Sequence, residues 1–161
     1  MEHTTPPVLA QAILDAVRRM AVHYGLWFAG AIEQFGLEKA LDIEKEAGDR
    51  ATQISIERLS SVLGLAKDEH GLPQALTNLS EEKLTQLLEA MAINWLALDG
   101  VWFQAVETRE GMAAAKTVND GCWAHFSPLE AARIKAMQQL PQAGGLEALA
   151  ATFLHRMYGV I

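Results

Sequence analysis

The chain repeats itself at a fixed offset along its length. The segment Gly25–Phe28, with the sequence Gly-Leu-Trp-Phe, recurs 75 positions later as Gly-Val-Trp-Phe at Gly100–Phe103. Further identities follow without a gap, and at the same offset they pair Gly36 with Gly111, Ala40 with Ala115, and Arg58 with Arg133. A period of this length is typical of a duplicated supersecondary unit. We therefore expect one domain, residues 1–161, that contains the same unit twice.

Apolar residues recur at helical spacing through both repeats. In the first repeat they are Leu9, Ile13, Ala16, Val17, Met20, Tyr24, Trp27, Phe28 and Ala31. Gly36 and Gly111 are natural helix ends, because glycine adopts left-handed conformations without strain. We expect the second helix of each repeat to bend, around Gly48 in the first and around Asn119–Gly121 and Pro128 in the second.

Short connections between helices favour antiparallel neighbours, so each repeat should form a helical hairpin. No segment shows the alternation of a strand. The pattern predicts an all-α bundle of two helical hairpins, residues 8–65 and 80–140, plus a short C-terminal helix. The helix that ends at Glu110 is apolar on nearly every side, and it is expected at the centre of the bundle.

The charge balance limits the partners that this chain is expected to bind. The 161 residues include 13 Lys and Arg against 20 Asp and Glu, a formal net charge of -7. Nucleic acids and anionic membranes both require a basic face, so neither is an expected partner. The single cysteine, Cys122, fits a reducing compartment. The first seven residues lack the pattern of a signal peptide, and we expect a cytoplasmic protein.

An apolar run at residues 87–106 approaches the length that spans a bilayer. It contains polar residues distributed round the helix, namely Glu89, Asn94, Asp99 and Gln104. Charged groups are costly in the middle of a membrane, and no basic residues flank the run, so we expect no membrane span.

Asp99 is the first candidate for a functional residue. It lies between Trp95 and Trp102 on the most apolar helix, and a buried carboxylate must be paired, hydrogen-bonded or protonated. Carboxylates with a perturbed pKa cluster in active sites, although structural networks perturb them too. The repeat alignment places Tyr24 opposite Asp99, with His23 beside it. These side chains could share one central cavity between the repeats.

The candidate ligand-binding residues are His23, Tyr24, Trp27, Trp95, Asp99, Trp102, Glu107 and Arg133. Aromatic rings with a few polar groups would suit a small polar or aromatic ligand. Alternatively, the repeated Gly-x-Trp-Phe segment is a packing device in which glycine permits close approach of helices. The candidate arginines, Arg58 and Arg133, could equally form salt bridges within the hairpins.

Three classes of function follow from these residues. The leading hypothesis is a small-ligand-binding module, or a homodimeric module that associates through an apolar face. The second is a small hydrolase-like or metal-dependent enzyme that uses Asp99, His23 and Glu107, with Cys122 and His125 as a further pair. The third is a structural protein that binds partners but no small molecule.

The sequence assigns no cofactor and no metal site. A diiron bundle requires glutamate followed three residues later by histidine on two of its helices. The glutamates on the predicted helices, Glu33, Glu57, Glu107 and Glu130, have no histidine at that position. No glycine-rich phosphate loop and no nucleophile elbow is present.

The segments His23–Phe28 and Asn94–Glu107 resemble the signature segments of an uncharacterised bacterial family of small, internally duplicated helical proteins of the cytosol. The resemblance covers the chain from about Leu14 to Leu140, and it implies an all-α fold without implying an activity. The chain is also distantly similar to the L-2-amino-thiazoline-4-carboxylic acid hydrolase-like proteins. That similarity would draw attention to Cys122 and Asp99, but no catalytic motif matches residue by residue.

Overall fold

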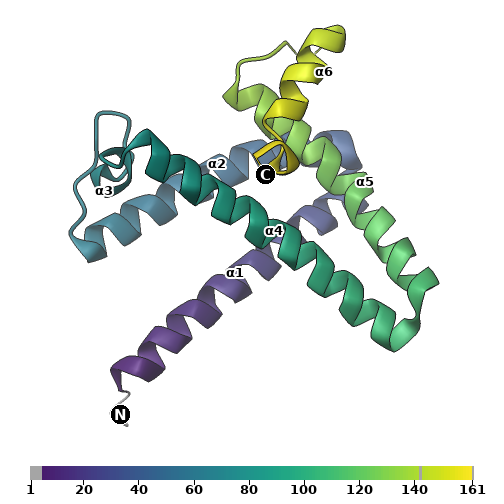
Figure 1. The fold of residues 1–161 in the computed structure, drawn as a ribbon, viewed down its shortest axis with the longest axis horizontal. Helices are drawn as coiled ribbons and strands as arrows, with labels where there is room; N and C mark the ends of the chain where they lie inside the picture. The colour runs from purple at the N-terminus through teal and green to yellow at the C-terminus, as the bar shows by residue number, and fades with distance from the viewer. Residues whose placement is uncertain (1–4, 142, 161) are drawn as a thin grey trace. The chain divides into compact units, whose positions relative to one another are not determined.

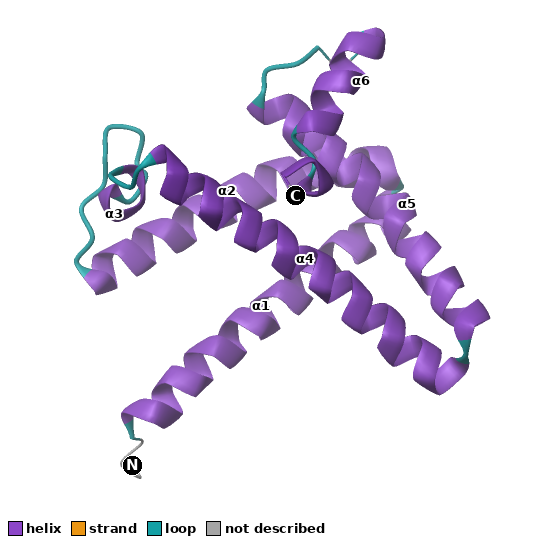
Figure 2. Cartoon of the chain, viewed as in Figure 1, coloured by secondary structure: helices purple, strands orange, loops and turns teal. Residues whose placement is uncertain are grey.

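The computed structural model of this chain describes residues 5–141 and 143–160. Within these residues all regular secondary structure is helical, and the nearest approach to a sheet is one isolated bridge between Lys67 and Pro73 (Figure 2). The helices are α1 (Pro6–Phe35), α2 (Leu37–Leu63), α3 (Gln74–Thr77), α4 (Glu81–Glu110), α5 (Met112–Met137), α6 (Gly145–Leu154) and α7 (Met157–Val160). The prediction of an all-α fold with two helical hairpins is confirmed. The expected C-terminal helix is divided into α6 and α7.

The chain divides into two compact units, Met1–Arg50 and Ala51–Ile161. The first unit contains α1 and the beginning of α2, and the second contains the rest of α2 and α3 to α7. The division falls inside the continuous helix α2 rather than between the two repeats. The single domain expected from the sequence stays a prediction. Residues 1–4, which begin the segment judged to lack a signal peptide, lie outside the described residues.

The turns of the two hairpins have the same geometry, which shows the duplication at the level of backbone angles. Gly36 has φ 80° and ψ 162°, and Gly111 has φ 86° and ψ 166°. Each glycine donates its N–H to the carbonyl four residues earlier, at 2.8 Å for Gly36 and 2.9 Å for Gly111. Such positive φ angles are accessible chiefly to glycine. Four residues after each turn lies a buried alanine, Ala40 in the first hairpin and Ala115 in the second.

Local signals also fix where α4 begins. Ser80 is extended, and its Oγ accepts a hydrogen bond from the N–H of Lys83 at 3.2 Å. Glu81 and Glu82 follow in the first turn, where negative charge is stabilised by the helix dipole. The cap lies at residue 80, the predicted first residue of the second hairpin, and it satisfies a backbone donor that the helix cannot satisfy itself.

The second helices are not interrupted where the sequence suggested. α2 continues through Gly48, and α5 continues through Asn119–Gly121 and Pro128. Gly48 is buried because the Tyr24 hydroxyl lies against it, so the glycine serves a tertiary contact and not a break. Pro128 removes one helical hydrogen bond. The half-buried side chains at all positions from Phe126 to Arg133 provide packing that offsets this loss.

In the second unit, α5 and α7 pack against α4, and α6 packs against α5 and α7 (Figure 1). The buried apolar residues among those described are Ala40, Ala92, Ala115, Ile134 and Ala148. In the described part of the chain no large side chain is fully buried. α4 buries only Ala92, so it lacks the central environment that its composition led us to expect. Many large apolar side chains of the described helices are exposed.

Candidate functional site

The candidate residues of the first repeat lie together on α1. The Trp27 indole N–H donates a hydrogen bond to Nε2 of His23 at 3.1 Å, one helical turn away. The Tyr24 hydroxyl donates to Oε1 of Glu44 on α2 at 2.5 Å. Tyr24 therefore fixes the hairpin, whereas the Trp27 side chain is 71% exposed. These hydrogen bonds of His23, Tyr24 and Trp27 all lie within the first unit.

The candidate residues of the second repeat lie on α4 and α5. Trp95, Asp99 and Glu107 are half-buried on α4, and Arg133 is half-buried on α5. Trp102 is exposed. The two groups of candidates belong to different units, so a site formed jointly by them stays a prediction.

Aromatic side chains from three helices form a cluster in the second unit. Trp95 of α4 contacts Trp123 and Phe126 of α5, each with ring centroids 5.6 Å apart, and Tyr158 of α7, at 4.9 Å. The Trp123 and Tyr158 rings stack at 5.7 Å with an interplanar angle of 12°. Offset and edge-to-face contacts of this kind add to the stability gained from burial alone. The cluster joins α7 to the second hairpin.

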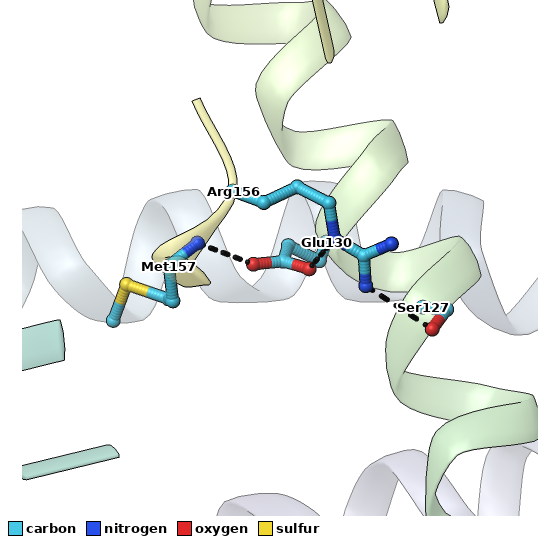
Figure 3. A network of polar contacts seen from close by, with 4 residues as sticks. All are labelled: Ser127, Glu130, Arg156 and Met157. Carbon is cyan, nitrogen blue, oxygen red and sulfur yellow. Dashed lines mark hydrogen bonds and ion pairs between the residues drawn. The ribbon is translucent and has the colours of Figure 1, made fainter. Parts of the chain in front are cut away.

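An ion pair beside this cluster ties the C-terminal segment to α5 (Figure 3). Arg156 donates from Nε to Oε2 of Glu130 at 2.6 Å and from Nη2 to Oγ of Ser127 at 3.2 Å. The Met157 N–H donates to Oε1 of the same glutamate at 2.9 Å. The Glu130 side chain is 9% exposed and that of Arg156 is 19% exposed. We call these four residues the C-terminal clamp.

Sequence reasoning missed both the cluster and the clamp. Trp123, Phe126 and Glu130 follow one another at spacings of three and four residues, which places them on one face of α5. That spacing was a usable signal. Their partners Arg156 and Tyr158 lie on a short terminal segment without periodicity, and nothing local in the sequence connects them to α5.

Cys122 and Asp99 lie on neighbouring helices, and their proximity affects the thiol. Partial burial raises the pKa of the Cys122 thiol, and the negative charge of Asp99 raises this pKa further. A thiol with a raised pKa is protonated at neutral pH, which is the opposite of what a cysteine nucleophile or metal ligand requires. His125, its proposed companion, is exposed. Among the described residues no three His, Cys, Asp or Glu side chains gather in an arrangement that could hold a metal ion.

The most extensive feature is the exposed apolar surface of α1. None of its 30 residues is buried. The exposed large apolar side chains of this helix are Val8, Leu9, Ile13, Leu14, Val17, Met20, Val22, Tyr24, Leu26, Trp27 and Phe35. No helix in the described part of the chain is long and apolar enough to cross a membrane. Soluble chains seldom leave contiguous apolar surface uncovered unless it is used for binding.

The repeated Gly-x-Trp-Phe segments are uncovered in the same way. Trp27 and Trp102 are 71% and 63% exposed, and their neighbours Leu26 and Val101 are 65% and 64% exposed. A Cβ built on Gly25 or Gly100 would meet no atom within 4 Å beyond the backbone of its own helix. Within the described residues neither glycine lies at a close contact between helices, and the packing alternative stays a prediction.

Comparison with known proteins agrees with the duplication. The model of a protein family described as "Family of unknown function (DUF6125)" matches the chain twice, over residues 7–79 and 74–161. The chain matches no curated protein and no solved structure. The two matched segments each contain one of the hairpins whose turns, at Gly36 and Gly111, share the same backbone angles.

Proposed function

The chain belongs to the Family of unknown function (DUF6125), and we propose that it is a self-associating helical module, a homodimer whose apolar helix faces are covered by a second copy. The observation that carries this proposal is the apolar surface of α1. None of the 30 residues of this helix is buried, and its exposed side chains include Leu9, Ile13 and Val17.

A second copy is a partner that suits an apolar surface of this kind. Obligate homodimers bury about 2,000–5,000 Å² or more, counted over both partners, and their interfaces are as apolar as a domain core. Closed two-fold symmetry is also the most common form of assembly among soluble proteins.

Folding energetics support the same proposal. The buried apolar residues among those described are four alanines and Ile134. Burial of a large apolar side chain contributes about 1.5–3 kcal/mol, whereas ordering the backbone costs about 1–2 kcal/mol per residue. The aromatic cluster adds packing in α4, α5 and α7, but α1 buries none of its 30 residues and gains little to offset this cost. Association would supply the missing burial, so that each chain folds fully only with its partner.

Multi-angle light scattering coupled to size exclusion tests the homodimer directly. We expect a mass of twice 17.6 kDa that persists on dilution through the micromolar range. A mass of one chain at every concentration would refute self-association. Native mass spectrometry of the same sample adds a second readout, since a stoichiometric extra mass would reveal a bound small molecule.

The predicted small-ligand site, bacterial origin and cytoplasmic location belong to the same proposal. The half-buried Asp99 near Trp95 supports a ligand site, and the single Cys122 is compatible with a reducing compartment. The hydrolase-like alternative draws less support, because the raised pKa of the Cys122 thiol disfavours the thiolate. Assay of the purified protein against cyclic thioimidates and amides, with a Cys122→Ser control, would test that alternative.

A further inference from the structure

The segment that follows α6 is attached to α4 and α5 by a few side chains. α7 is four residues long, and a helix of that length is not stable by itself. Arg156 pairs with Glu130, and the Tyr158 ring contacts two tryptophan rings. We call residues 156–158 the terminal segment. The segment and the residues that it contacts all lie in the second unit.

α4 and α5 offer this segment aromatic rings beside a carboxylate. We call this surface the acceptor face, and it consists of Trp95, Trp123, Phe126, Ser127 and Glu130. The guanidinium of Arg156 is held here in three ways. Its Nε donates to Oε2 of Glu130 at 2.6 Å, its Nη2 donates to Oγ of Ser127 at 3.2 Å, and its central carbon lies 5.8 Å from the centre of the Trp123 ring. A ring, a hydroxyl and a carboxylate together suit the planar, multiply donating guanidinium group.

The carboxylate of Glu130 makes the acceptor face depend on a bound cation. The Glu130 side chain is 9% exposed, and it accepts hydrogen bonds from Arg156 and from the Met157 N–H. Both donors belong to the terminal segment. A carboxylate left at this depth without a partner is costly. When the segment leaves, the acceptor face therefore favours another guanidinium in its place.

The duplication shows that the hairpin itself does not need an acceptor face. At the offset of 75 positions, the counterparts of Trp95, Trp123, Phe126 and Glu130 are Met20, Gly48, Ala51 and Ser55. These counterparts include no ring and no carboxylate, yet the turns of the two hairpins have the same backbone angles. The rings and the carboxylate are therefore a specialisation of the second repeat. Tryptophan, tyrosine and arginine are also the residues that dominate the energy of binding interfaces.

α6 connects α5 to the terminal segment and is itself lightly packed. Its large apolar side chains are between 50% and 83% exposed, namely Leu146, Leu149, Phe153 and Leu154. The buried residues of this helix are small, Ala148 and Thr152. Tyr158 is 47% exposed. The terminal segment thus lies at the surface, where local opening can release it from the acceptor face without opening a large core.

We propose that the acceptor face is a binding site for a peptide that carries an arginine two residues before an aromatic residue, and that the terminal segment is a tethered occupant that blocks it. The tether presents the segment at an effective concentration of about millimolar. A partner peptide must therefore compete with the chain's own terminus. This inference goes beyond the proposed homodimer and does not require it.

Calorimetric titration of the full-length chain tests the site. Arg156→Ala combined with Tyr158→Ala removes the occupant and gives an opened chain. The probe is an acetylated peptide of residues 155–160, His-Arg-Met-Tyr-Gly-Val. We expect one peptide to bind per opened chain, and the unmodified chain to bind it at least tenfold more weakly because its own segment competes. Lysine in place of the peptide arginine should weaken binding to the opened chain at least tenfold, since lysine lacks the planar set of donors.

A matched pair of substitutions in the opened chain locates the binding. Glu130→Gln should weaken binding of the probe peptide at least tenfold, because the carboxylate that accepts from the guanidinium is lost. Glu147→Gln removes the same charge from an exposed position on α6 and should leave the affinity nearly unchanged. Equal effects of the two substitutions would show that the peptide is attracted by the net charge of the protein and would overturn the assigned site.

The remaining outcomes also decide the inference. An opened chain that keeps its circular dichroism spectrum but binds no peptide would refute it, since the terminal segment would then be a fixed part of the fold. If the opened chain loses helix content, the unmodified chain is used with millimolar peptide. The Arg156 Nε–H signal in its nitrogen-15 spectrum should then lose protection from solvent exchange, and unchanged protection would refute the proposal. Light scattering reads the homodimer separately, so the failure of either proposal is recognised without the other.

Discussion

The reactivity of the Cys122 thiol reports on how side chains of the second unit are arranged around it. Partial burial raises the pKa of this thiol, and the charge of Asp99 raises this pKa further. Because the thiolate is the reactive form, we expect the rate of alkylation by iodoacetamide to have its midpoint at a higher pH in the folded protein than in the unfolded chain.

Asp99→Asn should lower this midpoint, but not to that of the unfolded chain in urea, since burial is the larger cause. A midpoint unchanged by Asp99→Asn would show that the two side chains are too far apart to interact.

The raised pKa of Cys122 also has a consequence for stability. The stabilising contribution of the protonated thiol is complete below the thiol pKa of the unfolded chain, and it is lost as the pH rises through the higher thiol pKa of the folded protein.

Glu130 is the residue on which the C-terminal clamp depends, since it accepts hydrogen bonds from both Arg156 and the Met157 N–H. Glu130→Gln should lower the free energy of unfolding by about 1.5–3 kcal/mol, the range for hydrogen bonds to charged groups. Trypsin should then cleave more readily after Arg156. Urea denaturation at one fixed protein concentration measures the first effect, and mass spectrometry of the digest measures the second.

The exposed pair of Asp15 and Arg19 provides a matched control for the clamp. It joins the same chemical groups at 2.9 Å, but both side chains are more than half exposed. Asp15→Asn should therefore change stability by less than about 1 kcal/mol. If Asp15→Asn and Glu130→Gln cost the same, burial is not what makes the clamp important.

At the scale of the helices, the two interhelical turns make a paired prediction. Gly36 and Gly111 have φ of 80° and 86°, where a side chain is strained, so alanine at either position should lower the free energy of unfolding by about 1–3 kcal/mol. Gly25→Ala and Gly100→Ala replace helical glycines that face open space, and each should be neutral or stabilising by about 1 kcal/mol. Thermal unfolding of the four variants measures both effects. A loss at Gly25 as large as that at Gly36 would contradict the backbone explanation.

Helix boundaries could be predicted from the sequence because their causes are local. Gly36, Gly111 and Ser80 act on the residues immediately beside them, and each ends or begins a helix where expected. Gly48 was expected to interrupt α2, but the helix continues through it, because the reason for a glycine at this position is a tertiary contact and not a local one. The Tyr24 hydroxyl, from the other helix of the hairpin, occupies the space that the missing side chain leaves.

The candidate site could be predicted only in part, for a related reason. Trp95 and Asp99 were recognised from their apolar surroundings, and both are half-buried in the second unit. The rings that contact Trp95 come from α5 and α7. Helical periodicity relates residues only a few positions apart, so it could not identify these distant partners. A composition rich in apolar residues also led us to expect a filled core, whereas the exposed apolar side chains of α1 show that composition does not specify what covers a helix face.

For the whole molecule, the proposed homodimer makes stability depend on concentration. Dissociation and unfolding would be coupled, and each tenfold dilution would remove about 1.4 kcal/mol of stability per dimer. With about 2.1 cal/mol/K of unfolding entropy per residue and two chains of 161 residues, the melting temperature should fall by about 2 °C per tenfold dilution. Calorimetry or circular dichroism over three decades of concentration measures this slope. A melting temperature that does not change on dilution would mean that each chain reaches its stable fold alone, and the uncovered surface would then have to serve a different partner.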